Sequence, residues 1–410
     1  MLLYIDPGTG SMLFTILIGL VGAGAYALRG LYMRIRFILS SGKADIKTSQ
    51  ALPLVIYSDD KRYWSVFKPI CDELERRGQQ VVYMTSSPDD PALDAEYKNV
   101  SCQFIGEGNR AFAKLNMMQA TLLLSTTPGL EVYQWKRSKG IKYYVHITHA
   151  PSDIAMYRMY GIDYYDALLL SGNYQVHQVR ELEELRKLPP KELAIVGIPY
   201  MDEMKKRLSL SCRQKEHSTT VLLAPSWGES SILKRFGTKI IDALLDTGYH
   251  IIIRPHPQSF KSESEMINDL IRRYNADERL EWNRDSDNFD VLNRADVLIS
   301  DFSGVIFDFC LVFDKPVVYT EVQYDKSPYD AYWLKEELWT FDVLPKLGVQ
   351  LDEDSIADIR NVIDDCLNND KYKAARNKAR EETWMYEGEG AVRSVDFLVE
   401  KLNFLGENKA

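Results

Sequence analysis

The tetrapeptide Arg254-Pro255-His256-Pro257 has the residue types of a phosphate-handling site, and it follows the apolar run YHIII. The two prolines restrict the backbone around the histidine. The Arg254 guanidinium can hold phosphate oxygens through two hydrogen bonds. The His256 imidazole can donate to a leaving phosphate or transfer a proton. A capped strand end with a surface arginine and a packed histidine is the structural alternative, but rigid loops often carry sites, and we favour function.

His149 is a second candidate, and it follows the apolar run KYYVHIT (142–148). The next residues, Ala-Pro-Ser-Asp, suit a first helical turn that Ser152 or Asp153 caps. His149 is therefore expected at the carboxyl end of a strand. A histidine there serves as a base or as a packing residue, and both interpretations stay open. His146, earlier in the same run, is expected to point into the core.

A third candidate is the segment Ser300-Asp301-Phe302-Ser303-Gly304, which lies between the apolar runs ADVLI and VIFDF. A strand, a hydroxyl-rich turn and a helix in this order form an anion cradle, because free N–H groups and the helix dipole favour negative charge. Ser300 and Ser303 add hydroxyl donors, and capping of the helix by Ser303 is compatible with this role. Ser226, in APSWG (224–228), is a weaker candidate, since such a segment is as readily an ordinary turn.

These candidates need a scaffold, and short apolar runs alternate with helical stretches along most of the chain. Strand-like runs lie at 53–58, 80–86, 120–126, 142–148, 165–172, 193–199, 219–227, 249–257, 295–303 and 315–320. Helix-like stretches include 64–77, 232–245, 263–274 and much of 353–405. The alternation predicts an α/β protein with two Rossmann-like, doubly wound parallel sheets. Ligands of such sheets bind at loops on the carboxyl ends of the strands.

The N-terminal segment predicts a membrane anchor. Residues 11–28 carry no charge, and as a helix they would span ~27 Å. Five basic residues follow within 29–47 and none precedes the segment, so the positive-inside rule places the N-terminus outside. A cleavable signal peptide and a buried helix are the alternatives. We therefore expect a single-pass protein of the cell membrane, with its catalytic domains in the cytoplasm.

The expected organisation is an anchor at 1–47, an acceptor-side domain at 48–210 and a donor-side domain at 211–410, with a hinge near 205–218. The net charge of −9 argues against a nucleic-acid partner. The five cysteines form no CxxC pair and the six histidines no HExxH motif, so neither a metal nor another cofactor is indicated. Asp285 and Asp287 precede a helix-like stretch and are expected to cap it.

Taken in order along residues 140–400, the motifs resemble the CDP-glycerol glycerophosphotransferase family, which builds teichoic-acid-type glycerol phosphate chains in bacteria. The strongest pieces are RPHP (254–257), SDFSGVIFDF (300–309) and KPVVYT (315–320). THAPSD (148–153), SGNYQ (171–175), GIPYMD (197–202) and APSW (224–227) also match. The resemblance implies a GT-B type fold of two Rossmann-like domains. Residues 50–140 match the family only in general architecture.

By that resemblance His149 is the general base, and His256 and Arg254 contact the donor phosphates. The donor-binding set comprises Arg254, Ser226, Ser300, Asp301, Ser303 and Gly304, and the catalytic set comprises His149 and His256. The implied partners are a CDP-glycerol-type donor and a lipid-linked or membrane acceptor, with CMP released.

Two other functions stay open. One is a GT-B glycosyltransferase with a nucleotide-sugar donor, for which Glu321 would grip a ribose or sugar. The other is a non-catalytic membrane scaffold of the same fold.

Overall fold

The computed structural model describes residues 52–211, 218–285, 287–301, 303–320 and 324–407. Residues 51–410 form one compact unit. The predicted anchor at 1–47 lies outside the described residues. Within the described ranges, no helix is both long and apolar enough to cross a membrane.

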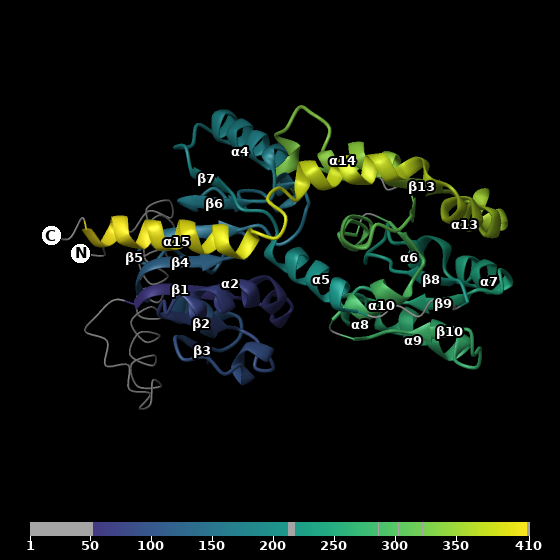
Figure 1. Cartoon of the computed structure of the whole chain (residues 1–410), viewed down its shortest axis with the longest axis horizontal. Helices are drawn as coiled ribbons and strands as arrows, with labels where there is room; N and C mark the ends of the chain where they lie inside the picture. Colours follow the sequence, from purple (N-terminus) through teal and green to yellow (C-terminus); the bar gives the residue numbers. More distant parts are fainter. Residues whose placement is uncertain (1–51, 212–217, 286, 302, 321–323, 408–410) are drawn as a thin grey trace, which may run out of the picture. The chain divides into compact units, whose positions relative to one another are not determined.

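The first sheet contains seven strands, all parallel to their neighbours (Figure 1). Its order is β3-β2-β1-β4-β5-β6-β7. The strands are β1 (Leu52–Ser58), β2 (Val81–Thr85), β3 (Val100–Phe104), β4 (Gln119–Ser125), β5 (Gly140–Ile147), β6 (Ala167–Leu170) and β7 (Glu192–Ile195). Both faces of the central strands are buried, which explains why these strands appear in the sequence as continuous apolar runs.

The second sheet repeats this arrangement with six parallel strands in the order β10-β9-β8-β11-β12-β13. The strands are β8 (Thr220–Leu223), β9 (His250–Ile253), β10 (Leu280–Trp282), β11 (Val297–Ser300), β12 (Val317–Thr320) and β13 (Gly348–Leu351). The predicted α/β fold with two doubly wound sheets is confirmed. The sequence did not predict β3, β10 and β13, because these edge strands are short and mix polar with apolar residues.

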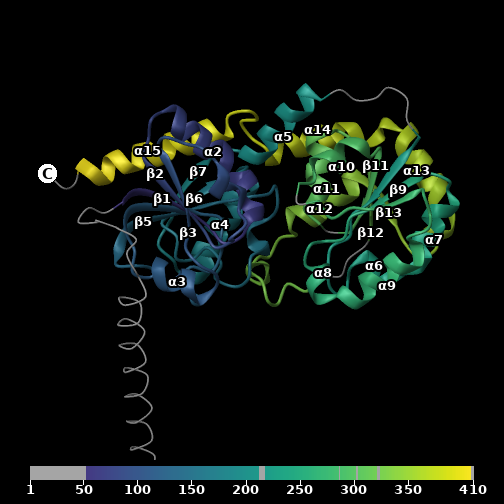
Figure 2. The same ribbon diagram turned by 90° about the horizontal axis from the view of Figure 1, so that it is seen from below.

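Helices cover both faces of each sheet (Figures 1 and 2). The first half contains α2 (Trp64–Arg76), α3 (Asn109–Leu115), α4 (Asn173–Arg186) and α5 (Pro199–Leu210). The remaining helices are α6 (Ile232–Phe236), α7 (Thr238–Asp246), α8 (Ser259–Ser262), α9 (Ser264–Tyr274), α10 (Phe289–Arg294), α11 (Val305–Phe307), α12 (Trp339–Leu347), α13 (Ile359–Asn368), α14 (Lys373–Thr383) and α15 (Gly390–Glu407). Residues 205–210, expected in a hinge, are instead the last turns of α5, whose Met201 and Met204 are buried.

Two segments of the second half return to the first half. Val395 and Leu398 of α15, yellow in Figure 1, pack into the same core as Phe67 and Ile70 of α2. The loop before α12 contributes Ala331, Leu334 and Leu338 to the core on the other face of the first sheet. Chain order alone therefore does not divide the two halves at residue 210.

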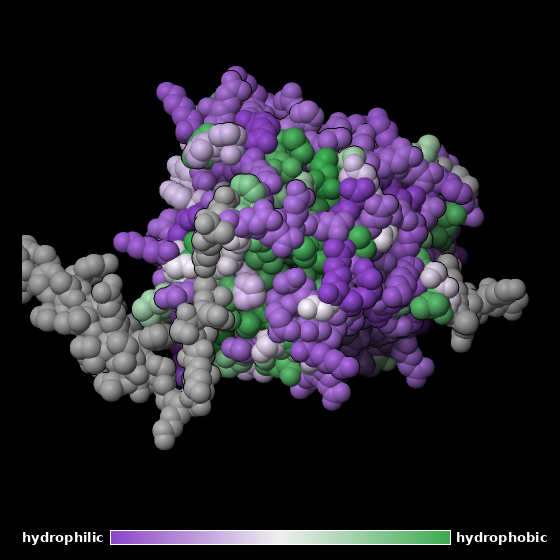
Figure 3. Space-filling view, turned by 60° about the vertical axis from the view of Figure 1, so that its left-hand side comes forward, coloured by the Kyte–Doolittle hydropathy of each residue, from purple (hydrophilic) through white to green (hydrophobic). Residues whose placement is uncertain are grey.

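Most of the described cysteines lie in the protein interior. Cys71, Cys310 and Cys366 are free and buried, and Cys102 is free and partly buried. The face shown in Figure 3 is mostly hydrophilic, with apolar side chains grouped between the polar ones. Exposed apolar residues of this kind are common on folded proteins.

Candidate active site

Polar residues follow the strands on both sides of the point where the first sheet reverses its order. Asp59 follows β1, Thr126 and Thr127 follow β4, and His149 lies two residues beyond β5. β1, β4 and β5 are neighbours, so these four residues share the carboxyl edge of the sheet. Open α/β sheets bind their ligands in the crevice at such a reversal. The first half therefore presents a carboxylate, two hydroxyls and an imidazole at its expected binding edge.

His149 is held by contacts to its ring and by contacts to the loop that carries it. Its Nδ1 lies 3.0 Å from Thr126 Oγ1, and its ring packs edge-on against Tyr63 with the centroids 5.0 Å apart. Tyr174 OH and Gln175 Nε2 donate to the Ser152 carbonyl at 3.0 and 2.7 Å, which fixes the loop after the histidine. In the tautomer in which Nδ1–H donates to Thr126 Oγ1, Nε2 carries the lone pair that can accept a proton.

Electrostatics keep His149 neutral. Burial lowers the pKa of His149 to about 4, and the positive charge of Arg62 lowers it further. At neutral pH the imidazole therefore carries a free lone pair and can accept a proton, as a general base must.

Asp153 does not have the expected role. The short 3₁₀ turn Ile154–Met156 receives no side-chain cap from it. Its carboxylate instead accepts hydrogen bonds from the backbone N–H groups of Trp339 (2.8 Å) and Thr340 (2.9 Å), at the start of α12. The prediction that Asp153 caps its own turn was wrong, because its carboxylate accepts hydrogen bonds from the first residues of α12 instead. Trp339, the first of these, is 186 residues away in the sequence.

His146 points into the core, as predicted. It is fully buried, and its Nε2 lies 3.0 Å from Tyr157 OH. Its Nδ1 is buried without a hydrogen-bond partner among the described residues. Burial lowers the pKa of His146 to about 3, and the neighbouring His149 adds to this effect.

The burial of His146 predicts that the folded protein loses stability in acid. The folded-state pKa of His146 is below the unfolded value, so between about pH 6.5 and about pH 3 the unfolded chain binds the proton and the folded chain does not. Stability is therefore lost as the pH falls through this window, by about 2 kcal/mol between pH 7 and pH 5 from this one imidazole. Chemical denaturation of His146→Gln at both pH values should show a loss on acidification that is smaller by this amount. The exposed His177→Gln variant should keep the wild-type loss.

Ser300 and Asp301, two candidates of the second half, are fully buried. They lie at the end of β11, which is beside β8 at the point where the strand order of the second sheet reverses. Asp301 accepts hydrogen bonds from the backbone N–H groups of Ser226 (3.0 Å) and Ile232 (3.2 Å). Ser300 Oγ donates to the Ala224 carbonyl at 2.6 Å. These side chains therefore hold the loop at 224–232 in place.

Ser226 is the member of this loop with a hydroxyl left for a ligand. Its side chain is 7% exposed, and its Oγ has no hydrogen-bond partner within the part of the chain that the structure describes. A buried hydroxyl without a partner is costly unless a ligand or water completes it. The prediction that Ser226 binds the donor gains a physical reason from this.

Arg254 and His256 follow β9, the neighbour of β8. Arg254 donates to Asn283 Oδ1, and burial lowers the pKa of its guanidinium while Asp285 and Asp287 oppose that shift. Asp287 also accepts from the Phe289 N–H at 3.0 Å, which confirms its predicted place at the start of α10. Arg254 is thus a partly desolvated cation, the state in which a guanidinium binds phosphate strongly.

The backbone fixes the protonation of His256. The Gln258 N–H donates to His256 Nδ1 at 3.1 Å, so in the neutral ring the hydrogen is on Nε2. Burial lowers the pKa of His256 to about 4, with Arg62 adding to the shift and Glu263 opposing it. His256 is therefore a neutral hydrogen-bond donor at physiological pH, whereas His149 offers a lone pair.

Ser303 and Gly304 lie at the start of α11. Gly304 occupies the N-cap position and no side chain caps the helix, so the capping alternative for Ser303 is not observed. Gly304 is exposed, and a Cβ added to it would meet no atom within 4 Å. Glu321 lies outside the described residues.

Arg62 connects the two sets of candidates. After burial, the positive charge of Arg62 is the second cause of the lowered pKa of both His149 and His256. Sequence reasoning missed Arg62, as well as Asp59, Tyr63 and Thr126. The available signal was position, since Asp59 stands directly after one predicted strand and Thr126 is the last residue of another.

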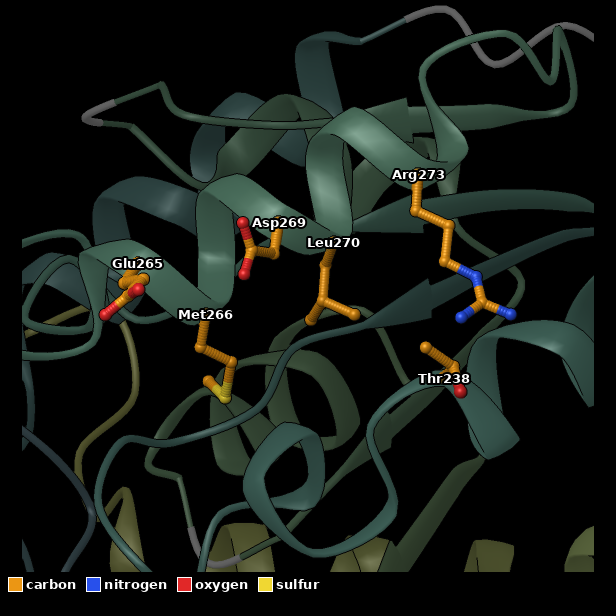
Figure 4. Close-up of a pocket in the computed structure, with 6 residues that line it drawn as sticks. All are labelled: Thr238, Glu265, Met266, Asp269, Leu270 and Arg273. Carbon is orange, nitrogen blue, oxygen red and sulfur yellow. The ribbon is translucent and has the colours of Figure 1, made fainter.

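A pocket on the second half lies apart from these residues (Figure 4). It measures about 440 Å³ and is lined by Thr238 of α7 and by Glu265, Met266, Asp269, Leu270 and Arg273 of α9. None of these residues follows a strand, so the pocket is not part of the candidate site. Among the described residues, no three histidine, cysteine or acidic side chains gather as metal ligands.

The family model of CDP-glycerol:poly(glycerophosphate) glycerophosphotransferases matches residues 150–400. The chain belongs to this family. It is a glycerophosphotransferase, as the resemblance predicted. No curated protein sequence matches the chain.

Solved structures share the fold of this glycerophosphotransferase at low identity. The wall teichoic acid polymerase TagF is 14% identical with a TM-score of 0.58, over 86% of this chain and 90% of the other. The UDP-GlcNAc 2-epimerase of Methanocaldococcus jannaschii is 12% identical with a TM-score of 0.54, over 85% and 99%. The S. aureus MnaA–UDP complex is 11% identical with a TM-score of 0.55, over 86% and 97%. These likenesses support the GT-B type of fold.

Proposed function

We propose that this glycerophosphotransferase moves glycerol phosphate from CDP-glycerol to a hydroxyl of a teichoic-acid-type acceptor and releases CMP. The pair of neutral histidines carries the proposal. His149 offers a free lone pair on one side, and His256 offers an Nε2–H donor on the other. The charge of Arg62 reaches both. A transfer between a hydroxyl and a diphosphate needs one base and one donor in this arrangement.

The reaction is an in-line displacement at the β-phosphorus of the donor. The acceptor oxygen forms a bond to that phosphorus, and its proton passes to His149 Nε2. The bond between the β-phosphorus and the bridging oxygen breaks, and CMP leaves with the electron pair. Arg254 and His256 stabilise the charge on the leaving phosphate, and the loop fixed by Asp301 orients the donor. Positioning and electrostatics supply most of the rate, as in phosphoryl transfer generally.

The acceptor side of the proposal includes a membrane. The uncharged segment at 11–28 and the basic residues after it are suited to a single-pass anchor with the N-terminus outside and the catalytic residues in the cytoplasm. An anchored enzyme and a lipid-linked acceptor share one plane, which raises their effective concentration.

Calorimetry with the full-length protein in detergent tests the donor. CDP-glycerol should bind more tightly than UDP-glucose, because the proposal assigns the site to a cytidine diphosphate alditol. CMP should bind more weakly than CDP-glycerol, since it lacks the β-phosphate and the glycerol of the donor. Tighter binding of UDP-glucose would contradict the proposal and favour a sugar transferase.

A further inference from the structure

Asp59 occupies a position at which open α/β sheets bind ligands. It follows β1, and Thr127 follows β4, so the two residues face each other across the strand reversal of the first sheet. The Thr127 hydroxyl donates to Asp59 Oδ1 at 2.8 Å. Thr127 is itself held, since Tyr165 OH donates to its carbonyl at 2.5 Å. The carboxylate is therefore placed by residues of two strands rather than carried on a free loop.

Asp59 is accessible to solvent, although other residues lie close to its carboxyl group. The residue is exposed, yet protein surrounds its carboxyl closely enough that desolvation raises its pKa, with the Thr127 hydroxyl opposing the shift. Burial, and after it the charge of Asp59, raises the pKa of Tyr63, whose ring packs against His149. A solvent-accessible carboxylate held in place at the carboxyl edge of the sheet is able to receive a polar ligand.

A short chain of contacts connects Asp59 to the base. Asp59 contacts Thr127, and the adjacent Thr126 contacts His149 Nδ1. The carboxylate and the imidazole thus stand at the ends of β1 and β5, on either side of β4, and two consecutive threonines that follow β4 join them. All these residues precede residue 150, where the match to the family model begins.

We propose that Asp59 binds the acceptor: its carboxylate accepts a hydrogen bond from the hydroxyl next to the one that His149 deprotonates, and the site thereby selects acceptors that end in a vicinal diol. This inference rests on the proposed function. A carboxylate at neutral pH only accepts hydrogen bonds, so a hydroxyl is its natural uncharged ligand. A site that binds a substrate hydroxyl discriminates against an analogue without it, because the carboxylate then loses that hydrogen bond.

The test compares two synthetic acceptors in the full-length enzyme with CDP-glycerol as donor. One acceptor ends in a glycerol phosphate unit with adjacent free hydroxyls, and the other lacks the secondary hydroxyl. Wild-type kcat/KM should favour the diol by about 50-fold, an effect of the size that one hydrogen bond to a charged group produces. In Asp59→Asn and Asp59→Ala this preference should fall to about onefold to threefold, with the loss confined to the diol acceptor.

Matched measurements separate the outcomes. Asp89→Asn removes an exposed carboxylate of the same half and should keep the full preference for the diol. Calorimetry should show unchanged CDP-glycerol affinity in Asp59→Asn, which confirms that the variant is folded. Retention of the diol preference in both Asp59 variants, or its absence in the wild type, would overturn the inference while the transferase function stands. Absence of any transfer from CDP-glycerol by the wild type would overturn both.

Discussion

Replacing His149 with asparagine is expected to lower kcat about 1,000-fold, within the range that general base catalysis contributes. Asparagine preserves the hydrogen-bonding contact to Thr126 but has no lone pair basic enough to accept the acceptor proton. The change removes an interaction of the transition state, so KM for the donor should stay close to wild type. Steady-state transfer assays with CDP-glycerol measure both parameters.

The pH profile distinguishes a lost base from a disturbed fold. Because burial holds the pKa of His149 near about 4, wild-type kcat/KM should be level near neutral pH and fall as the pH approaches about 4. The kcat/KM of His149→Asn should not show the fall that protonation of His149 causes in the wild type. His177→Asn, on the exposed side of α4, serves as the control and should transfer at the wild-type rate. Near-wild-type turnover of His149→Asn would remove His149 from the mechanism.

The sequence predicted the scaffold because central parallel strands leave a strong pattern. Strands buried on both faces consist of continuous apolar residues, and the candidate residues stand where those runs end. This was sufficient to place His149 and Arg254 at strand ends. The edge strand β10, with only three residues, leaves no such pattern.

The sequence could not separate residues that meet the ligand from residues that hold the loops. Asp301 has the residue type of a ligand-binding group, but its carboxylate accepts backbone N–H groups of another loop. Lys315, in the KPVVYT motif, donates to the carbonyls at the end of α10, including Ala295 O at 2.6 Å. Both partners are distant in sequence, and no local pattern encodes them. The sequence motifs therefore contain side chains that support loops as well as side chains that do chemistry.

Separation along the chain also kept the sequence from indicating the roles of Asp59 and Arg62. Asp59 acquires its setting from Thr127, which is 68 residues away, and Arg62 acts on two histidines of different halves. Each is an ordinary polar residue in the sequence. The parallel order of β1 and β4 brings Asp59 and Thr127 to one edge of the first sheet.

Arg254→Ala is expected to lower kcat/KM for CDP-glycerol about 300-fold, as for the loss of one preorganised group that stabilises transition-state charge. The guanidinium is partly desolvated and is oriented by Asn283, so its attraction for phosphate is stronger than that of a surface arginine. Arg254→Lys should recover only part of the loss, because an ammonium cannot form the paired hydrogen bonds of a guanidinium. Transfer kinetics and calorimetry with CDP-glycerol together measure the effect.

The charges around Arg254 allow an effect on donor binding to be distinguished from an effect on stability. Without donor, Arg254 balances Asp285 and Asp287, so its removal should change stability less than it changes donor affinity. Arg272→Ala, which removes an exposed arginine paired with Asp269 on α9, is the control and should leave kcat/KM unchanged. Donor affinity should fall more for CDP-glycerol than for cytidine, because cytidine has no phosphate for the guanidinium to contact. Equal losses for the two ligands would mean that Arg254 shapes the loop rather than binding the diphosphate.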